Sequence, residues 1–390
     1  MPGSPSRNSN PKTPKRRSSS SPRWGRPPVT CPPFEESVAA RTRHMRERLA
    51  RAAGAVGRHV RVMEVCGTHT HAIGRGGLRA MLPGNVELVS GPGCPVCVTS
   101  QRDIERMLVL ARHPGLTVCT FGDMIRVPGI TSSLERERSA GADIRVVYSP
   151  VEALALAERE PEREVAFLAV GFETTSPGVA SVLLQAHGRA VANLSVYASH
   201  KLIVPAMHAV LDGGSRIDGF VTPGHVSVVI GPEAYEALST QYSIPCVATG
   251  FEPIDVLEGI GMLLECMAEG RTGSFVQYTR AVKPGGNRRA WDTLLRAFEV
   301  ADAEWRGLGA IPSSGLRLKP ELRHFDAVAR YAVPDIEPVD LPGCRCGDVL
   351  KGLIHPPECP LFRTACTPRN PIGPCMVSSE GSCAARYRYG

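Results

Sequence analysis

Short apolar runs alternate with helical stretches along most of the chain. Each run ends abruptly in Gly, Pro, Thr, Cys, His or an acidic residue, and a helical pattern follows it. The runs occupy residues 60–65, 86–89, 117–120, 144–148, 165–170, 190–198, 219–222 and 244–249. Continuous apolar strands separated by helices are typical of parallel sheets that are covered on both faces. The pattern therefore predicts an α/β fold.

Helical stretches and a repeated phrase indicate how the chain is divided. Helical periodicity covers residues 34–56, 254–268 and 288–306. The phrases Ala-Val-Gly-Phe-Glu-Thr-Thr at 169–175 and Ala-Thr-Gly-Phe-Glu-Pro-Ile at 248–254 nearly repeat each other where a strand meets a helix. We therefore expect two similar α/β domains and a cysteine-rich end. The expected divisions are a disordered tail at 1–35, a first domain at 36–148, a second at 149–270 whose last part could pack with the first, and a helical connection with the cysteine-rich domain at 271–390.

The net charge of +7 is concentrated at the N-terminus. Residues 1–34 contain no acidic residue and seven basic ones, Arg7, Lys12, Lys15, Arg16, Arg17, Arg23 and Arg26. The rest of the chain is formally neutral, so it lacks the basic footprint of a protein that binds nucleic acid. The tail itself is rich in Ser, Pro and Arg, a composition typical of disorder.

The apolar content and the cysteines indicate the compartment. No apolar run approaches the roughly 20 residues that span a bilayer, and the basic N-terminus lacks the apolar segment of a secretory signal. An odd number of cysteines, 13, without an export signal argues against a secreted disulfide framework. We therefore expect a cytoplasmic protein with no membrane partner. No Gly-x4-Gly-Lys-Ser/Thr loop indicates nucleotide hydrolysis.

Residues that carry chemistry follow the ends of several apolar runs. Cysteine and histidine occur in Cys-Gly-Thr-His-Thr-His at 66–71, two cysteines in Gly-Pro-Gly-Cys-Pro-Val-Cys at 91–97, and polar groups in Gly-Phe-Glu-Thr-Thr at 171–175, Ser-His-Lys at 199–201 and Pro-Gly-His at 223–225. Ligands bind at the carboxyl ends of strands in open α/β sheets. We therefore expect a solvent-reachable site that contains Cys66, His69, Cys94, Cys97, Glu173 and His200.

The residue types suggest chemistry but leave alternatives open. Cys94 and Cys97 have the spacing of a redox disulfide, of half a metal site, or of two structural thiols. Cys66 offers a soft thiolate beside imidazoles, which suits iron or another transition metal. Glu173 and His200 suit proton transfer or the orientation of other groups, whereas Thr174 and Thr175 suit helix capping.

A second group of cysteines lies in the last 47 residues. Cys344, Cys359, Cys366 and Cys383 could close an iron–sulfur cluster or a structural zinc site, and Cys346 and Cys375 are alternates. The spacing is irregular and lacks the close pairs of zinc ribbons, which favours iron–sulfur. A bound metal would also order a segment that has little apolar residue content of its own.

These motifs, in this order over residues 36–390, resemble the HypD family of hydrogenase maturation proteins. The resemblance implies two similar α/β domains around a central cleft, plus a domain that holds a [4Fe–4S] cluster. It further implies a small HypC-like chaperone, a HypE-like donor of cyanide, and an iron that receives two cyanides and one carbon monoxide before transfer to the hydrogenase large subunit.

The family's functional residues can be carried over by motif. Cys66 matches the cysteine that binds this iron, and Cys94 and Cys97 match the redox pair. The expected cluster ligands are Cys344, Cys359, Cys366 and Cys383. We expect electrons to pass from the cluster to the Cys94–Cys97 pair and on to the iron site. The alternatives are a cluster-dependent thiol–disulfide oxidoreductase and a zinc-stabilised binding protein.

Overall fold

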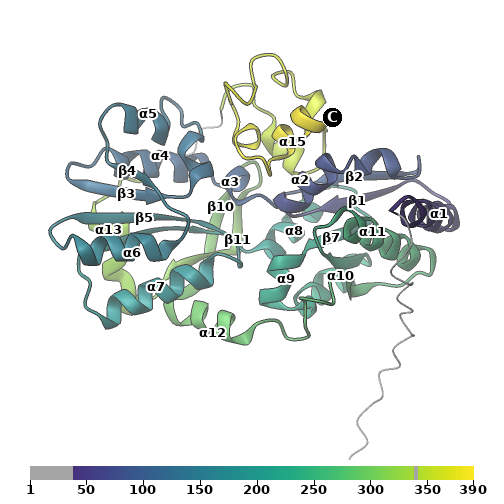
Figure 1. Cartoon of the computed structure of the whole chain (residues 1–390), viewed down its shortest axis with the longest axis horizontal. Helices are drawn as coiled ribbons and strands as arrows, with labels where there is room; N and C mark the ends of the chain where they lie inside the picture. Colours follow the sequence, from purple (N-terminus) through teal and green to yellow (C-terminus); the bar gives the residue numbers. More distant parts are fainter. Residues whose placement is uncertain (1–37, 338–340) are drawn as a thin grey trace, which may run out of the picture. The chain divides into compact units, whose positions relative to one another are not determined.

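The computed structural model describes residues 38–337 and 341–390. The tail at 1–35, predicted to be disordered, lies outside the described residues. The chain divides into two units, Met1–Arg41 and Thr42–Gly390. The described part of the first unit is only the start of helix α1 (Val38–Val56). All further elements belong to the second unit (Figure 1).

Two parallel sheets carry the fold of the described residues. The five-stranded sheet has the order β2-β1-β7-β8-β9, formed by β1 (Val60–Glu64), β2 (Val86–Ser90), β7 (Gly219–Pro223), β8 (Pro245–Thr249) and β9 (Gly273–Val276). The four-stranded sheet has the order β4-β3-β5-β6, formed by β3 (Leu116–Thr120), β4 (Ile144–Val146), β5 (Glu164–Gly171) and β6 (Leu194–His200). The predicted α/β class is confirmed, because every predicted run overlaps one of these parallel strands.

The strands do not follow the expected domain boundary between residues 148 and 149. Strands β3 and β4, expected in the first domain, pair with β5 and β6. Strands β7 and β8 lie in the last part of the second range, which we expected could pack with the first domain, and they continue the sheet that begins with β1 and β2. The chain therefore leaves the first sheet after β2 and returns to it after β6. A single boundary in the sequence cannot separate the two sheets, because each sheet contains strands from before and after residue 148.

Helices cover the sheets (Figure 1). Those up to β9 are α2 (Gly67–Arg75), α3 (Pro95–Val98), α4 (Gln101–Ala111), α5 (Leu134–Ser139), α6 (Pro150–Arg159), α7 (Ser176–Gly188), α8 (Ile203–Asp212), α9 (Gly224–Ile230), α10 (Glu236–Tyr242) and α11 (Pro253–Ala268). The last of them confirms the helix predicted at 254–268. One cluster of buried side chains includes Met63 and Val89 from one sheet and Leu168 and Tyr197 from the other, so the sheets share a core.

Only the first part of the helix predicted at 288–306 is present. Helix α12 (Arg288–Ala297) ends where an antiparallel hairpin begins, formed by β10 (Phe298–Trp305) and β11 (Gly309–Leu318). Phe298 and Trp305 are buried, and pairing with β11 overrides the helical propensity of the Ala and Glu residues between them. None of the helices within 38–337 and 341–390 has the length and apolar character required to cross a bilayer.

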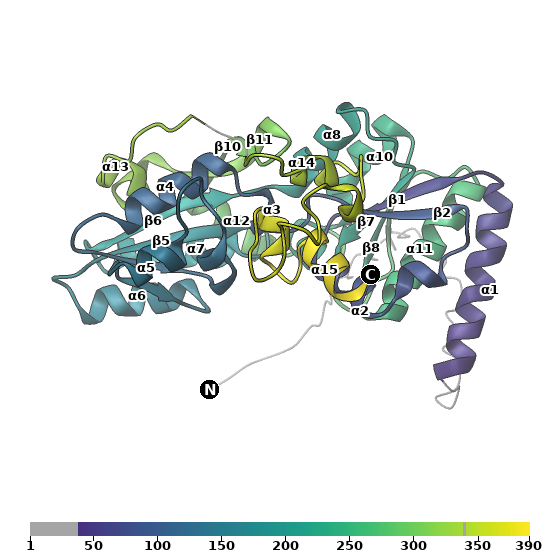
Figure 2. The same ribbon diagram turned by 90° about the horizontal axis from the view of Figure 1, so that it is seen from above.

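The C-terminal segment reaches back to the loops that follow β1 and β2. It contains α14 (Cys346–Leu350), the 3-10 helix η6 (Pro374–Met376) and α15 (Ser382–Tyr389), after the short helix α13 (Ala327–Arg330). Helix α15 packs against α2, and η6 packs against α3. Both views show this segment beside α2 and α3 (Figures 1 and 2). The cysteine-rich end is therefore next to the first two cysteine motifs.

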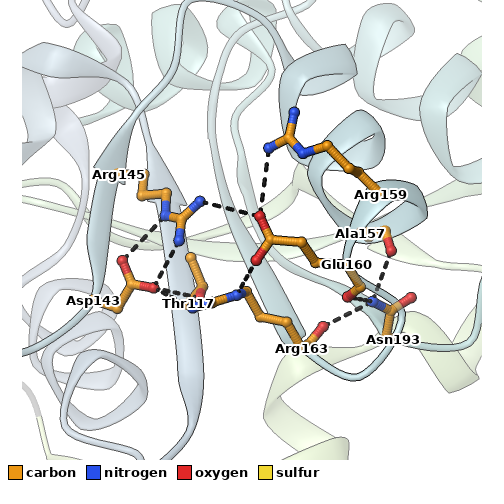
Figure 3. A network of polar contacts seen from close by, with 8 residues as sticks. All are labelled: Thr117, Asp143, Arg145, Ala157, Arg159, Glu160, Arg163 and Asn193. Atoms are coloured by element: carbon orange, nitrogen blue, oxygen red, sulfur yellow. Dashed lines mark hydrogen bonds and ion pairs between the residues drawn. The ribbon is translucent and has the colours of Figure 1, made fainter.

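A polar network joins the amino-terminal ends of the strands in the four-stranded sheet (Figure 3). The Asp143 carboxylate accepts hydrogen bonds from Thr117 Oγ1 (2.7 Å) and Arg163 Nη1 (2.7 Å). Asn193 Nδ2 donates to the carbonyl oxygens of Ala157 (2.9 Å) and Arg163 (2.7 Å). These contacts join the starts of the four strands β3, β4, β5 and β6. They lie at the end of the sheet away from the carboxyl ends, where ligands of parallel sheets bind.

Candidate functional site

Cys66 lies at a topological switch point of the five-stranded sheet. It directly follows Val65 at the end of β1, and it occupies the cap position of helix α2. The strand order reverses beside β1, because β2 pairs on one side and β7 on the other. Ligands of open parallel sheets bind in the crevice at such a point. Cys66 is partly exposed there.

A buried glutamate, which we did not predict as a site residue, holds the Cys66 loop. Glu64 Oε2 accepts a hydrogen bond from the Cys66 backbone N–H (3.0 Å), and Oε1 accepts one from Thr70 Oγ1 (2.5 Å). Burial raises the pKa of Glu64 to about 7. The available signal was an acidic residue at the end of an otherwise apolar run, since burying a carboxyl group is costly unless it is hydrogen-bonded.

A second carboxylate approaches Cys66 from the C-terminal segment. Glu380 Oε1 accepts a hydrogen bond from Thr68 Oγ1 (2.7 Å) on the first turn of α2. Burial raises the pKa of the Cys66 thiol to about 12, and the charges of Glu380 and Glu64 add to this rise. Glu380 also faces the exposed His225, whose imidazole lies tilted against the Phe251 ring with centroids 4.1 Å apart. No sequence pattern singles out Glu380, because its position depends on tertiary packing.

The loop of Cys94 is pressed against the loop of Cys66. Gly67 N donates to Gly93 O (2.9 Å), and a Cβ added to Gly93 would lie only 2.0 Å from Cys66 N. Cys94 then caps helix α3, and its sulfur accepts the Cys97 backbone N–H (3.4 Å). The three predicted cysteines are therefore on adjoining loops. Of the three, only Cys66 is partly exposed, because Cys94 and Cys97 are buried in the core.

Cys97 is the first of a series of neighbouring thiols that extends into the C-terminal segment. Its thiol interacts with the thiols of Cys94 and Cys375. The sulfurs of Cys375 and Cys346 lie 2.7 Å apart, and Cys346 also contacts the Cys344 thiol. Burial is among the causes that raise the pKa of the Cys97 and Cys375 thiols. Cys346 and Cys375, predicted only as alternates, thus link the Cys94–Cys97 pair to the remaining cysteines.

The cysteines of the C-terminal segment line one small cavity. Its lining includes Cys344, Cys346, Cys359, Cys366, Cys375 and Cys383. The thiol of Cys383 interacts with those of Cys344, Cys359 and Cys366, the other three predicted cluster ligands. Gly373 leaves the room that Cys344 needs, since a Cβ there would lie 2.5 Å from its sulfur. In the part of the chain that is described, no three His, Cys, Asp or Glu side chains form a ready single-ion metal site.

His69 is buried and held by contacts within the fold. Its Nε2 contacts Gly250 O (3.0 Å) and Thr249 Oγ1 (2.9 Å), and its ring stacks on Phe251. Burial lowers the pKa of His69 to about 4, so the imidazole is neutral near pH 7. These contacts fasten α2 to the end of β8 and thereby fix the direction of the helix that Cys66 caps.

Glu173, His200 and Lys201 make no hydrogen bond to Cys66, Cys94 or Cys97 among the described contacts. Glu173 Oε1 accepts the Ile203 N–H (2.9 Å) at the start of α8. His200 is buried edge-on against Phe298, and burial lowers its pKa to about 3. Lys201 pairs with Asp103 (3.3 Å). The proton-transfer roles of Glu173 and His200 therefore stay predictions.

Comparison with known proteins agrees with the resemblance. The family model HypD, described as "Hydrogenase formation hypA family", matches residues 40–390. The chain belongs to the HypD family. "Hydrogenase maturation factor HypD" of Azotobacter vinelandii is 47% identical over 341 residues, which are 85% of this chain and 90% of that protein. The protein of the same name from Escherichia coli (strain K12) is 44% identical over 356 residues, 91% of this chain and 95% of its own length.

The HypD family match extends over every element of the site. It includes both sheets, the hairpin and the cysteine-rich segment, because it runs from residue 40 to the last residue. "Hydrogenase maturation factor HypD" of Rhizobium leguminosarum bv. viciae, 46% identical over 337 residues, covers 84% of this chain and 88% of its own. The protein is thus a HypD-family hydrogenase maturation factor.

Proposed function

We propose that this HypD-family protein assembles the Fe(CN)2CO moiety of a [NiFe]-hydrogenase. In this proposal Cys66 binds the iron, which is the substrate, together with a HypC-like small chaperone. A HypE-like partner donates cyanide, and the finished moiety passes to the hydrogenase large subunit. The work takes place in the cytoplasm, where thiols stay reduced, and involves neither nucleic acid nor a membrane. The observation that carries the proposal is the series of thiols that begins beside the Cys66 loop.

Cys66 has the surroundings that a transient iron ligand requires. A thiolate is a soft donor, and cyanide and carbon monoxide withdraw the electron density that it supplies to iron. The thiol must lose its proton when it binds metal. Glu64 holds the loop through the Cys66 backbone N–H.

The residues of the C-terminal segment fit a resident [4Fe–4S] cluster. Cys344, Cys359, Cys366 and Cys383 would hold it, since their four thiols interact around one cavity and Gly373 leaves space at Cys344. When bound, such a cluster supplies single electrons. The remaining two cysteines of the segment, Cys346 and Cys375, are then free for thiol chemistry.

Cys346 and Cys375 form a second dithiol that can exchange with Cys94 and Cys97. The Cys375 thiolate attacks Cys97 Sγ of an oxidised Cys94–Cys97 disulfide, and Cys94 leaves as a thiolate. Cys346 then attacks Cys375 Sγ and releases the Cys97 thiolate. Two electrons have moved to Cys94 and Cys97, and the Cys346–Cys375 pair is oxidised. The interaction of Cys97 with Cys375 and the contact of Cys375 with Cys346 support this order.

Replacement of the Cys94–Cys97 pair tests the redox part of the proposal. In a host that lacks its own HypD, we expect the Cys94→Ala/Cys97→Ala variant to lose hydrogenase maturation by at least about a hundredfold, because no dithiol remains beside Cys66. Anaerobically purified variant protein should keep the absorption of its cluster. The measurements are hydrogenase activity in extracts and iron and sulfide content.

A matched control is Cys119→Ala, which removes a buried thiol from β3 outside the site. It should support maturation like the unsubstituted protein. Normal maturation by the double variant would refute the redox role. Metal analysis in the same experiment separates the alternatives, since zinc in place of iron and sulfide would favour a zinc-stabilised binding protein.

A further inference from the structure

A cavity of about 450 Å³ lies apart from the cysteines. It is enclosed by the loop after β5, the starts of α8 and α12, the end of α9 and the 3-10 helix η3 (Pro232–Tyr235). Cysteine is absent from its lining. Sites for small molecules typically have volumes of about 300–1,000 Å³ and combine apolar walls with a few polar groups. This cavity has both properties.

The buried polar group of the cavity is the carboxyl group of Glu173. The side chain is only 2% exposed. One oxygen accepts the Ile203 N–H, as described above, whereas Oε2 has no hydrogen-bond partner among the described residues. The nearby Tyr235 hydroxyl does not satisfy it, because that hydroxyl contacts Ser227 Oγ (3.1 Å). A buried, unpaired carboxyl oxygen costs free energy, and a donor in the cavity would recover it.

The walls and the outer part of the cavity restrict the kind of donor. Leu202, Val204, Val229 and Ile230 give apolar walls. Arg288 and Asp292, one helical turn apart on α12, are exposed lining residues. Neither makes an ion pair or hydrogen bond through its side chain within residues 38–337 and 341–390. Arg288 attracts an anionic group, and Asp292 disfavours a ligand that is anionic at both ends.

We infer that this cavity binds a small organic molecule with an N–H donor at one end, an apolar stem and a carboxylate at the other. The N–H group meets Glu173 Oε2, the stem contacts the apolar walls, and the carboxylate meets Arg288. The site is separate from the thiol series and adds a ligand-binding function to the assembly role proposed above.

Titration calorimetry of the full chain with ω-amino carboxylates of four to eight carbons tests this inference. Each compound is compared with the carboxylate and the amine of the same length, for example 5-aminopentanoate with pentanoate and pentylamine. We expect the best-fitting ω-amino carboxylate to bind about tenfold more tightly than either, because each comparison compound lacks one charged hydrogen bond.

Two variants and one control assign the binding to this cavity. Arg288→Ala removes an exposed side chain and should weaken binding about tenfold, whereas Arg289→Ala, the neighbouring exposed arginine, should leave it unchanged. Glu173→Gln keeps an acceptor for Ile203 N but presents an N–H to the ligand, so binding should fall by a similar factor. Absence of binding by the whole series up to roughly 10 mM, or unchanged affinity in Arg288→Ala, would overturn the inference.

Discussion

At the scale of single residues, Cys66, His69 and His200 have different surroundings. All three come at or just after the end of a predicted apolar run, and we expected all three at the candidate site. The structure distinguishes them, because Cys66 is partly exposed, His69 is hydrogen-bonded to the end of β8, and His200 is buried against Phe298. Burial and hydrogen-bond partners come from tertiary packing, so nothing in the sequence pointed to Glu380, whereas Glu64 had the signal of an acidic residue at the end of an apolar run.

The burial of His200 makes a prediction about stability and pH. Burial lowers the pKa of His200 to about 3, below the unfolded value of about 6.5. The unfolded chain therefore binds the extra proton first, and stability is lost as the pH falls below about 6.5. Between pH 7.5 and 5.5 this group should remove about 1.4 kcal/mol from the free energy of unfolding.

The His200→Phe variant lacks this contribution. The free energy of unfolding is measured with urea at pH 7.5 and at pH 5.5. Its decrease between the two pH values should be about 1.4 kcal/mol smaller in His200→Phe than in the unsubstituted protein. The exposed His44→Gln serves as the control and should follow the unsubstituted protein. An identical pH dependence in His200→Phe would mean that the buried imidazole is not neutral in the folded protein.

At the scale of elements, the apolar runs predicted the parallel strands because both faces of these sheets are covered. The same criterion missed β9, a four-residue strand whose side chains are only half buried, and it missed the hairpin of β10 and β11. In the hairpin, pairing with β11 makes residues 298–305 a strand although their sequence favours a helix. The close approach of the Cys66 and Cys94 loops also left no pattern in the sequence beyond the glycine at position 93, which has no Cβ to prevent it.

Gly93 gives a prediction about these loops. In Gly93→Ala, the new Cβ would overlap the backbone of Val65 and Cys66, which cannot yield as a flexible side chain could. We expect a loss of about 1–3 kcal/mol or more in the free energy of unfolding, measured with urea. Gly84→Ala is the matched control, because a Cβ there meets nothing within 4 Å. Equal stability of the two variants would contradict the tight contact.

At the scale of the whole molecule, the sequence predicted the presence of three parts but not how the chain is shared among them. The five-stranded sheet is completed only by β7, β8 and β9, which follow the entire four-stranded sheet in the chain. The last segment then returns to α2 and α3 and brings Cys375 to Cys97. Such long-range contacts leave no local pattern, which is why Cys346 and Cys375 stayed ambiguous in the sequence.

The contact between Cys97 and Cys375 is tested most directly by trapping it. In the Cys94→Ser/Cys346→Ser variant, Cys97 and Cys375 keep each other as partners but lose the thiols that would resolve a disulfide between them. Mild oxidation followed by peptide mass spectrometry should yield the Cys97–Cys375 disulfide as the main cross-link, with Cys119 and Cys246 still free. If Cys97 instead remains fully alkylatable, or pairs elsewhere, the two dithiols do not exchange and the proposed route for electrons to the Cys66 site is wrong.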